Sequence, residues 1–219
     1  MASKIGKHPL IVGMLLSTSL LALPHALAAD KAATGVKTSG FYVGGGVGQA
    51  KAMQFQDTCS LISSAGGVVS DCDNKGFAFK AFGGYQFIRY FGVEVGYADF
   101  GRARAKVSSP GQGDVDFKTR AIFLDGVVTV PIINRLSFLA KAGVVRWNTK
   151  LNVAASTGLA VPSQSENGIS GMFGAGFEYM FSNSFGMRAE YEIYENMGDD
   201  NTTGETHIQM ISVSGLLRF

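Results

Sequence analysis

Apolar and polar side chains alternate over the last nine residues of the sequence. Four large apolar residues share one parity with Gly215, whereas Ser212, Ser214 and Arg218 lie between them; the four are Ile211, Val213, Leu217 and Phe219. Only Leu216 departs from this pattern. A period of two indicates a β-strand whose two faces meet different environments, one apolar and one polar.

Eight segments along the chain have this strand character. They cover residues 40–53, 76–87, 91–103, 115–130, 135–151, 168–181, 185–197 and 206–219. The connections alternate in length: residues 88–90, 131–134 and 182–184 form short turns, and residues 54–75, 104–114, 152–167 and 198–205 form long polar loops. Short turns at one end and long loops at the other are typical of a barrel that spans the bacterial outer membrane, with the short turns in the periplasm.

The charged residues of these strands share one face. In residues 91–97, for example, Phe91, Val95 and Tyr97 alternate with Gly92, Glu94 and Gly96. In a soluble sandwich the charged face would point to water. In a membrane barrel it points inward, and the aromatic face meets lipid.

The amino terminus has the features of a secretion signal. Lys4 and Lys7 precede an apolar stretch over residues 10–23, and Ala26-Leu27-Ala28 resembles a signal peptidase site. We expect residues 1–28 to be removed, before Ala29 or Asp30, residues 29–39 to form a periplasmic segment, and residues 40–219 to form the barrel.

Composition agrees with a narrow barrel. The sequence contains 29 Gly, 16 Phe and 7 Tyr in 219 residues, and a barrel with aromatics outside and glycine inside uses such a composition. Without Lys4 and Lys7 the chain has 17 basic and 17 acidic residues, so no nucleic acid is an expected partner. We predict an all-β protein, an eight-stranded antiparallel up-and-down transmembrane β-barrel of the Gram-negative outer membrane.

A weak internal repeat strengthens this prediction. Residues 91–97 and 185–191 share the frame Phe-Gly-x-charge-x-x-Tyr, with Glu94 and Arg188 at the equivalent inward position. Two hairpins of one design on opposite walls of a narrow barrel would bring these two charges together.

The chain resembles the transmembrane domain of the outer-membrane protein A family. The resemblance is carried by residues 82–86, 91–97 with 101–102, 131–132, 141–143 with Trp147, 176–179, 188–191 and 196–199. It implies an inward cluster of paired charges that plugs the barrel, matched here by Glu94, Glu178 and Arg188. The sequence has no peptidoglycan-binding domain after Phe219, so cell-wall anchoring is not part of the expectation.

One position departs from the family pattern. The family carries a lysine on the fourth strand where this chain has Val127, which puts the family's switchable ion-pair gate in doubt. Asp125, Lys80 and Lys141 could build a different network. With Glu190, the predicted interior network is Lys80, Glu94, Asp125, Lys141, Glu178, Arg188 and Glu190.

Both cysteines, Cys59 and Cys72, fall in the first long loop. A secreted protein meets an oxidising compartment, and the mature chain has one histidine, His207, which leaves a metal site short of ligands. We predict a disulfide that stabilises this loop by about 3 kcal/mol in the chain-entropy model.

Function depends on the interior and the loops. Eight strands leave an interior that side chains can fill, so we predict a protein that supports envelope integrity and presents loops for adhesion or other surface contacts. A narrow or gated pore is the alternative, and a lipid-modifying enzyme a more remote one, because His207 stands without a partner nucleophile. We expect no catalytic residue, metal or cofactor. The expected partners are outer-membrane lipid and lipopolysaccharide and a surface ligand of the loops. The assembly machinery would read Ile211, Val213, Leu217 and Phe219, and we expect a monomer.

Overall fold

The computed structural model describes residues 39–53, 68–73, 75–109, 113–155, 164–197 and 206–219. For residues 68–73, 103–109, 113–117, 151–155 and 164 the description is of the backbone alone. The described residues form nine strands: β1 (Gly40–Ala52), β2 (Val68–Asp73), β3 (Lys75–Ile88), β4 (Phe91–Ser109), β5 (Gly113–Ile133), β6 (Leu136–Ala155), β7 (Gln164–Met180), β8 (Phe185–Met197) and β9 (Thr206–Arg218). Over these ranges no helix has the length and apolar character needed to cross a membrane.

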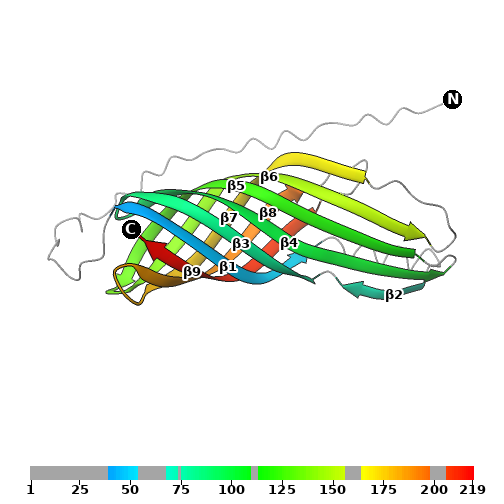
Figure 1. Ribbon diagram of the computed structural model, residues 1–219, viewed down its shortest axis with the longest axis horizontal. Helices are drawn as coiled ribbons and strands as arrows, with labels where there is room; N and C mark the ends of the chain where they lie inside the picture. The colour runs from blue at the N-terminus through cyan, green and yellow to red at the C-terminus, as the bar shows by residue number, and fades with distance from the viewer. Residues whose placement is uncertain (1–38, 54–67, 74, 110–112, 156–163, 198–205) are drawn as a thin grey trace, which may run out of the picture. The chain divides into compact units, whose positions relative to one another are not determined.

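Eight of the strands close into a ring (Figure 1). The order around it is β4, β3, β1, β9, β8, β7, β6, β5, and β5 pairs with β4 again. Each neighbouring pair is antiparallel, including the seam between β1 and β9. The prediction of an eight-stranded antiparallel barrel is therefore confirmed.

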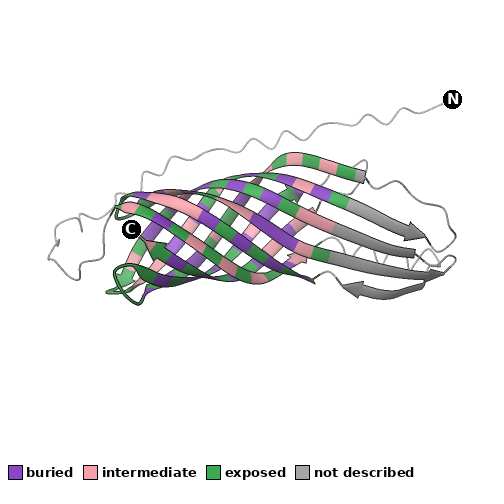
Figure 2. Cartoon of the chain, in the orientation of Figure 1, coloured by how far each residue is buried: buried purple, intermediate pink, exposed green. Residues whose placement is uncertain are grey.

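The ring gives every strand two faces of opposite character. Along each strand of the ring, more exposed and more buried residues alternate wherever Figure 2 describes their burial. On β3, Phe77 and Phe79 are exposed, whereas Ala78 between them and Lys80 and Phe82 after them are buried. The same parity holds on β4, β7 and β8, where Glu94, Glu178 and Arg188 face inward as the alternation predicted.

The prediction of a second long loop was wrong for most of its residues. Residues 104–114 were expected to leave the sheet, but β4 continues to Ser109 and β5 begins at Gly113. Polar sequence shows that these residues leave the bilayer, but it does not stop two strands from satisfying each other's backbone hydrogen bonds in water. β7 likewise begins four residues earlier than predicted, at Gln164.

Two smaller corrections concern the neighbouring connections. β2 lies within the predicted first loop. It pairs with residues 104–109 of β4, and β3 pairs with the preceding part of β4, so β2 takes the place of β3 as the neighbour of β4 beyond the ring. The turn predicted at residues 131–134 is shorter, because β5 runs through Pro131 to Ile133 with an irregularity in its register. Only Asn134 and Arg135 form the turn.

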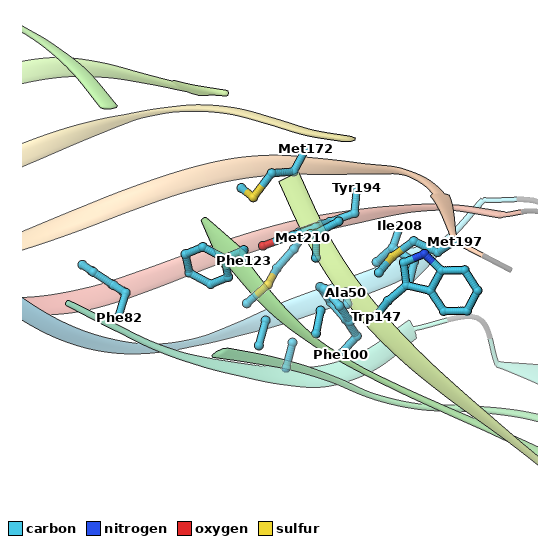
Figure 3. Packing of buried hydrophobic residues seen from close by; sticks show 14 of the residues in the cluster. Ala50, Phe82, Phe100, Phe123, Trp147, Met172, Tyr194, Met197, Ile208 and Met210 are labelled. Carbon is cyan, nitrogen blue, oxygen red and sulfur yellow. The ribbon is translucent and has the colours of Figure 1, made fainter. Parts of the chain in front are cut away.

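An apolar layer fills the barrel on the side of the long loops. It includes Phe100, Phe123, Met172, Tyr194 and Met210, all nearly inaccessible to solvent. The ring of Phe100 packs edge-on against Tyr194 with centroids 4.7 Å apart. Figure 3 shows this layer extending from Phe82 towards Trp147 and Met197.

Candidate functional site

Polar side chains from all eight strands of the ring meet inside the barrel. They are Tyr42, Lys80, Glu94, Asp125, Lys141, Glu178, Arg188, Glu190, Glu192 and Arg218. All but Arg218 are at most 4% exposed, and the Arg218 side chain is 11% exposed. We call these residues the interior charge cluster.

Arg188 joins opposite walls of the barrel. Its Nη1 donates to Glu94 Oε1 on β4, which lies four strands away around the ring from β8. Its Nη2 and Nε donate to Glu178 Oε2 at 2.9 and 3.2 Å. The hydroxyl of Tyr42 donates to the same Glu94 oxygen at 3.0 Å. These contacts fix the position of the Arg188 guanidinium relative to the carboxylates of Glu94 and Glu178.

The two lysines of the cluster link Glu94 to the carboxylates of β8. Lys141 Nζ lies 2.7 Å from Glu94 Oε2 and 2.8 Å from Glu190 Oε1. Lys80 Nζ donates to Glu190 Oε2 at 2.5 Å and to Glu192 Oε2 at 2.8 Å. At the end near the termini, Arg218 Nη2 donates to Glu178 Oε1 at 2.6 Å. The ion pairs therefore form one continuous chain from Arg218 to Lys80.

The ring of Phe82 lies among the three central cations. Lys80, Lys141 and Arg188 lie 5.7, 5.4 and 5.1 Å from its centroid. Buried cations over an aromatic face gain attraction without any hydrogen bond. Gly44 makes room for this ring, because a Cβ at that position would lie 2.7 Å from Phe82 Cε2.

Asp125 is held less tightly by neighbouring side chains than the other members of the cluster. Its nearest cation is Lys141, at 3.9 Å, and neither carboxylate oxygen accepts a hydrogen bond within the described residues. The cluster contains five carboxylates and four cations. A buried carboxylate without a full partner set is costly, so the cluster has one acid more than its cations can balance.

The seven residues predicted for the interior network all lie in this cluster. Three further members were not in the predicted set. Glu192 shares the inward parity of Glu190, and Arg218 shares that of Ser212 and Ser214, so alternation could have found both. Tyr42 is uncharged, and only its contact with Glu94 reveals its part.

The remaining predicted positions lie elsewhere. Cys59 is outside the described residues, and Cys72 lies on β2 opposite Ala105, with its side chain not described. Ile211, Val213, Leu217 and Phe219 all point outward and are exposed. The Phe219 amide donates to the Phe41 carbonyl at 2.9 Å across the β1–β9 seam. His207 is half-buried at the start of β9, and its carbonyl accepts a hydrogen bond from the Met53 amide at 3.0 Å.

Comparison with known families agrees with this geometry. The OmpA-like transmembrane domain matches residues 36–219. The chain belongs to this family. Outer membrane protein A of Yersinia pseudotuberculosis is 30% identical over 171 residues, which cover 77% of this chain and 45% of that protein. Its counterpart in Klebsiella aerogenes is 30% identical over 91% of this chain and 54% of its own length. The chain thus spans about half the length of these relatives.

Solved structures show the same fold. Neisserial surface protein A aligns with a TM-score of 0.58 at 19% identity, over 84% of this chain and 99% of its own. Ail, the attachment invasion locus protein of Yersinia pestis, aligns with a TM-score of 0.53 at 17% identity, over 84% of this chain and all of its own. Family and fold place the protein in the Gram-negative outer membrane as a transmembrane β-barrel.

Proposed function

We propose that this protein is a closed outer-membrane barrel that presents its external loops for surface contact and supports the envelope as a rigid element. The observation that carries the proposal is the filled interior. The interior charge cluster occupies one part of the lumen and the apolar layer the next, and both are buried.

A filled lumen is unfavourable for a diffusion pore. Water and ions would have to displace ion pairs that bridge opposite walls, such as Arg188–Glu94 and Lys80–Glu190. Opening these pairs would leave buried charges without partners, at a cost of several kcal/mol. The pore alternative therefore requires a rearrangement of the cluster.

The external side is the better candidate for function. Loops on a rigid scaffold commonly carry binding. The strand ends that border residues 54–67, 110–112, 156–163 and 198–205 all lie at one end of the ring, opposite the turns at residues 89–90, 134–135 and 181–184. Ail, which shares the fold, bears the name of an attachment protein and was also solved with the heparin analogue sucrose octasulfate. A Cys59–Cys72 disulfide would stiffen the first loop, residues 54–67, towards β2.

The enzyme alternative has little support from the described residues. His207 is on β9, and the residues the structure describes contain no group of three or more His, Cys, Asp or Glu side chains arranged to hold a metal ion. The matched relatives carry the name outer membrane protein A. The proposal also includes two targeting steps: residues 1–28 direct export of the chain, and the outward residues of β9 direct its insertion into the outer membrane.

Planar-bilayer recording on the refolded protein tests the closed interior. We expect no stable channels from the unmodified chain and clear conductance from Lys141→Ala/Arg188→Ala, which removes two central cations from the cluster. Stable channels in the unmodified protein would overturn the closed-barrel proposal and favour the pore.

Binding by intact cells tests the surface role. Cells that produce the full chain should adhere to a heparin-coated surface better than cells that produce a variant with residues 54–67 replaced by a Gly-Ser linker. Heat-modifiable migration on a gel should show equal amounts of folded barrel in both. Equal adhesion by both cell types would argue against a role for this loop.

A further inference from the structure

Five basic side chains gather on the outward face of β4, β5 and β6. They are Arg102, Lys118, Arg120, Arg146 and Lys150, and we call them the basic face. The strand register places Lys118 opposite Arg102 on one side and opposite Lys150 on the other. Arg120 follows two residues after Lys118, on the same face, and Arg146 lies opposite the outward Ile122.

The basic face begins where the apolar band ends on each strand. The last apolar outward residues are Tyr97 on β4, Ile122 on β5 and Val144 on β6. Ile122 and Val144 are 58% and 54% exposed. This level lies away from the short turns, and in an outer-membrane barrel the short turns are periplasmic. The basic face therefore lies at the headgroup level of the outer leaflet.

A bulge in β4 decides the direction of Arg102. The register shifts between Asp99 and Arg102, and Gly101 there has a φ of 79°. Asp99 Oδ1 accepts a hydrogen bond from the Gly101 amide at 3.0 Å and so supports the bulge. Without the bulge, Arg102 would share the inward parity of Ala98 and Phe100. With it, Arg102 lies opposite Lys118 and is exposed.

The face carries an excess of positive charge. Among its described outward neighbours on these strands, the acidic one is Asp99, which lies 3.1 Å from Arg120 Nε and 3.6 Å from Lys118 Nζ. Beyond the face, the register opposes Arg104 with Asp116 and Lys106 with Asp114. At the matching level of β7, β8 and β9 the outward residues are Asn167, Glu195 and Gln209. On β1 and β3, which continue the ring beyond β4, the outward residues at this level are Lys51 and Lys75, opposite each other in the register, and Lys51 also lies opposite Gln209. Outward basic residues therefore run from β1 and β3 through β4 to β6, and the described outward residues of β7, β8 and β9 at this level include no Lys or Arg.

We propose that the basic face binds the phosphate groups of a phosphorylated glycolipid of the lipid A type in the outer leaflet. Arginine and lysine donate charge-assisted hydrogen bonds to phosphate oxygens. The exposed apolar side chains directly below would hold the acyl chains of the same molecule. This inference depends on the outer-membrane location of the family and is independent of the proposed role of the loops.

The adjacent apolar band favours a lipid over a soluble polyanion. A polysaccharide or sulfated glycan offers negative charge but nothing to cover Ile122 and Val144. A lipid satisfies both parts of the surface at once, and long basic side chains at a membrane interface direct their charges to the headgroups.

Native mass spectrometry of the refolded full chain in detergent tests the proposal, with bisphosphorylated lipid A as the probe. The test variant is Arg102→Gln/Lys150→Gln. It keeps Lys118 and Arg120, so their ion pairs with Asp99 are retained. The matched control is Arg89→Gln/Arg135→Gln, which removes two exposed basic residues from the short turns at the other end. We expect the test variant to bind lipid A about thirtyfold more weakly and the control to bind as the unmodified chain does.

Dephosphorylated lipid A and soluble heparin complete the experiment. Dephosphorylated lipid A should bind the unmodified chain as weakly as intact lipid A binds the test variant. Equal losses in test and control variants, or equal binding of the two lipids, would overturn the proposal. So would a loss of heparin binding in the test variant with unchanged lipid A binding. Arg146→Gln/Lys150→Gln replaces the test variant if heat-modifiable migration shows that the first does not fold.

Discussion

Lys141 on β6 lies directly opposite Val127 on β5. Val127 is the position at which family resemblance places a lysine, and its side chain is fully buried. The ammonium of Lys141 reaches Glu94 at 2.7 Å and Glu190 at 2.8 Å. The cluster thus has a central lysine that comes from the neighbouring strand.

Moving this lysine back across the register should be tolerated better than removing it. We expect Lys141→Val to destabilise the barrel by about 3–5 kcal/mol, because Glu94 and Glu190 lose a buried partner. Val127→Lys/Lys141→Val should recover at least about 1 kcal/mol of that loss. The free energy of unfolding in urea, measured in lipid vesicles, gives both values.

An exposed lysine on the same strand supplies the control for this experiment. Lys150→Gln should change the free energy of unfolding by less than about 0.5 kcal/mol, since it touches no buried charge. A double variant no more stable than Lys141→Val would mean that a lysine at position 127 does not reach the same carboxylates.

Glu94 and Arg188 should be energetically coupled. Arg188→Ala leaves Glu94 and Glu178 without their guanidinium partner, and a loss of about 3–5 kcal/mol is expected. Glu94→Ala/Arg188→Ala should cost less than the sum of the two single changes, by about 1–3 kcal/mol. Urea unfolding of the four proteins measures the coupling, and planar-bilayer conductance should rise in the variants. Additive losses with unchanged conductance would show that this pair does not seal the lumen.

The predicted Cys59–Cys72 disulfide concerns the first loop and not the barrel. Replacing both cysteines with serine should speed proteolysis of residues 54–67 on intact cells, because the loop loses a constraint worth about 3 kcal/mol in its unfolded ensemble. Heat-modifiable migration of the barrel should stay the same. Two free thiols in freshly isolated, non-reduced protein would contradict the prediction.

Phe219 should matter for closure of the barrel. Its amide donates to the Phe41 carbonyl across the β1–β9 seam, and its ring is 61% exposed on the lipid face. Deleting Phe219 should lower the amount of folded barrel in the outer membrane, measured by heat-modifiable migration. Refolding of the same variant in detergent separates the two causes: normal refolding assigns the defect to assembly, and failed refolding assigns it to the seam. An unchanged folded amount in cells would contradict the prediction.

Alternation along each strand was enough to predict the barrel and its two faces. A strand has a period of two wherever it lies, so Phe77 and Phe79 could be assigned outward, and Lys80, Glu94 and Arg188 inward, from neighbouring residues alone. The alternation of short and long connections then ordered the strands. Strand ends were less accurate, because polar residues such as those at 104–109 can continue a sheet beyond the membrane.

Closure of the ring decided which inward charged side chains form ion pairs with one another. Lys80 reaches Glu190 and Glu192 across 110 and 112 residues of sequence, and parity alone does not say which of several inward carboxylates lies at the same height. That height depends on register and stagger around eight strands. The basic face has the same origin: a single bulge at Gly101 turns Arg102 from the lumen to the lipid, and cross-strand register gathers residues 102, 118 and 150 into one patch. The sequence determined which face each residue of a regular strand takes, because that is a local property, whereas contacts between distant strands exist only once the sheet has closed.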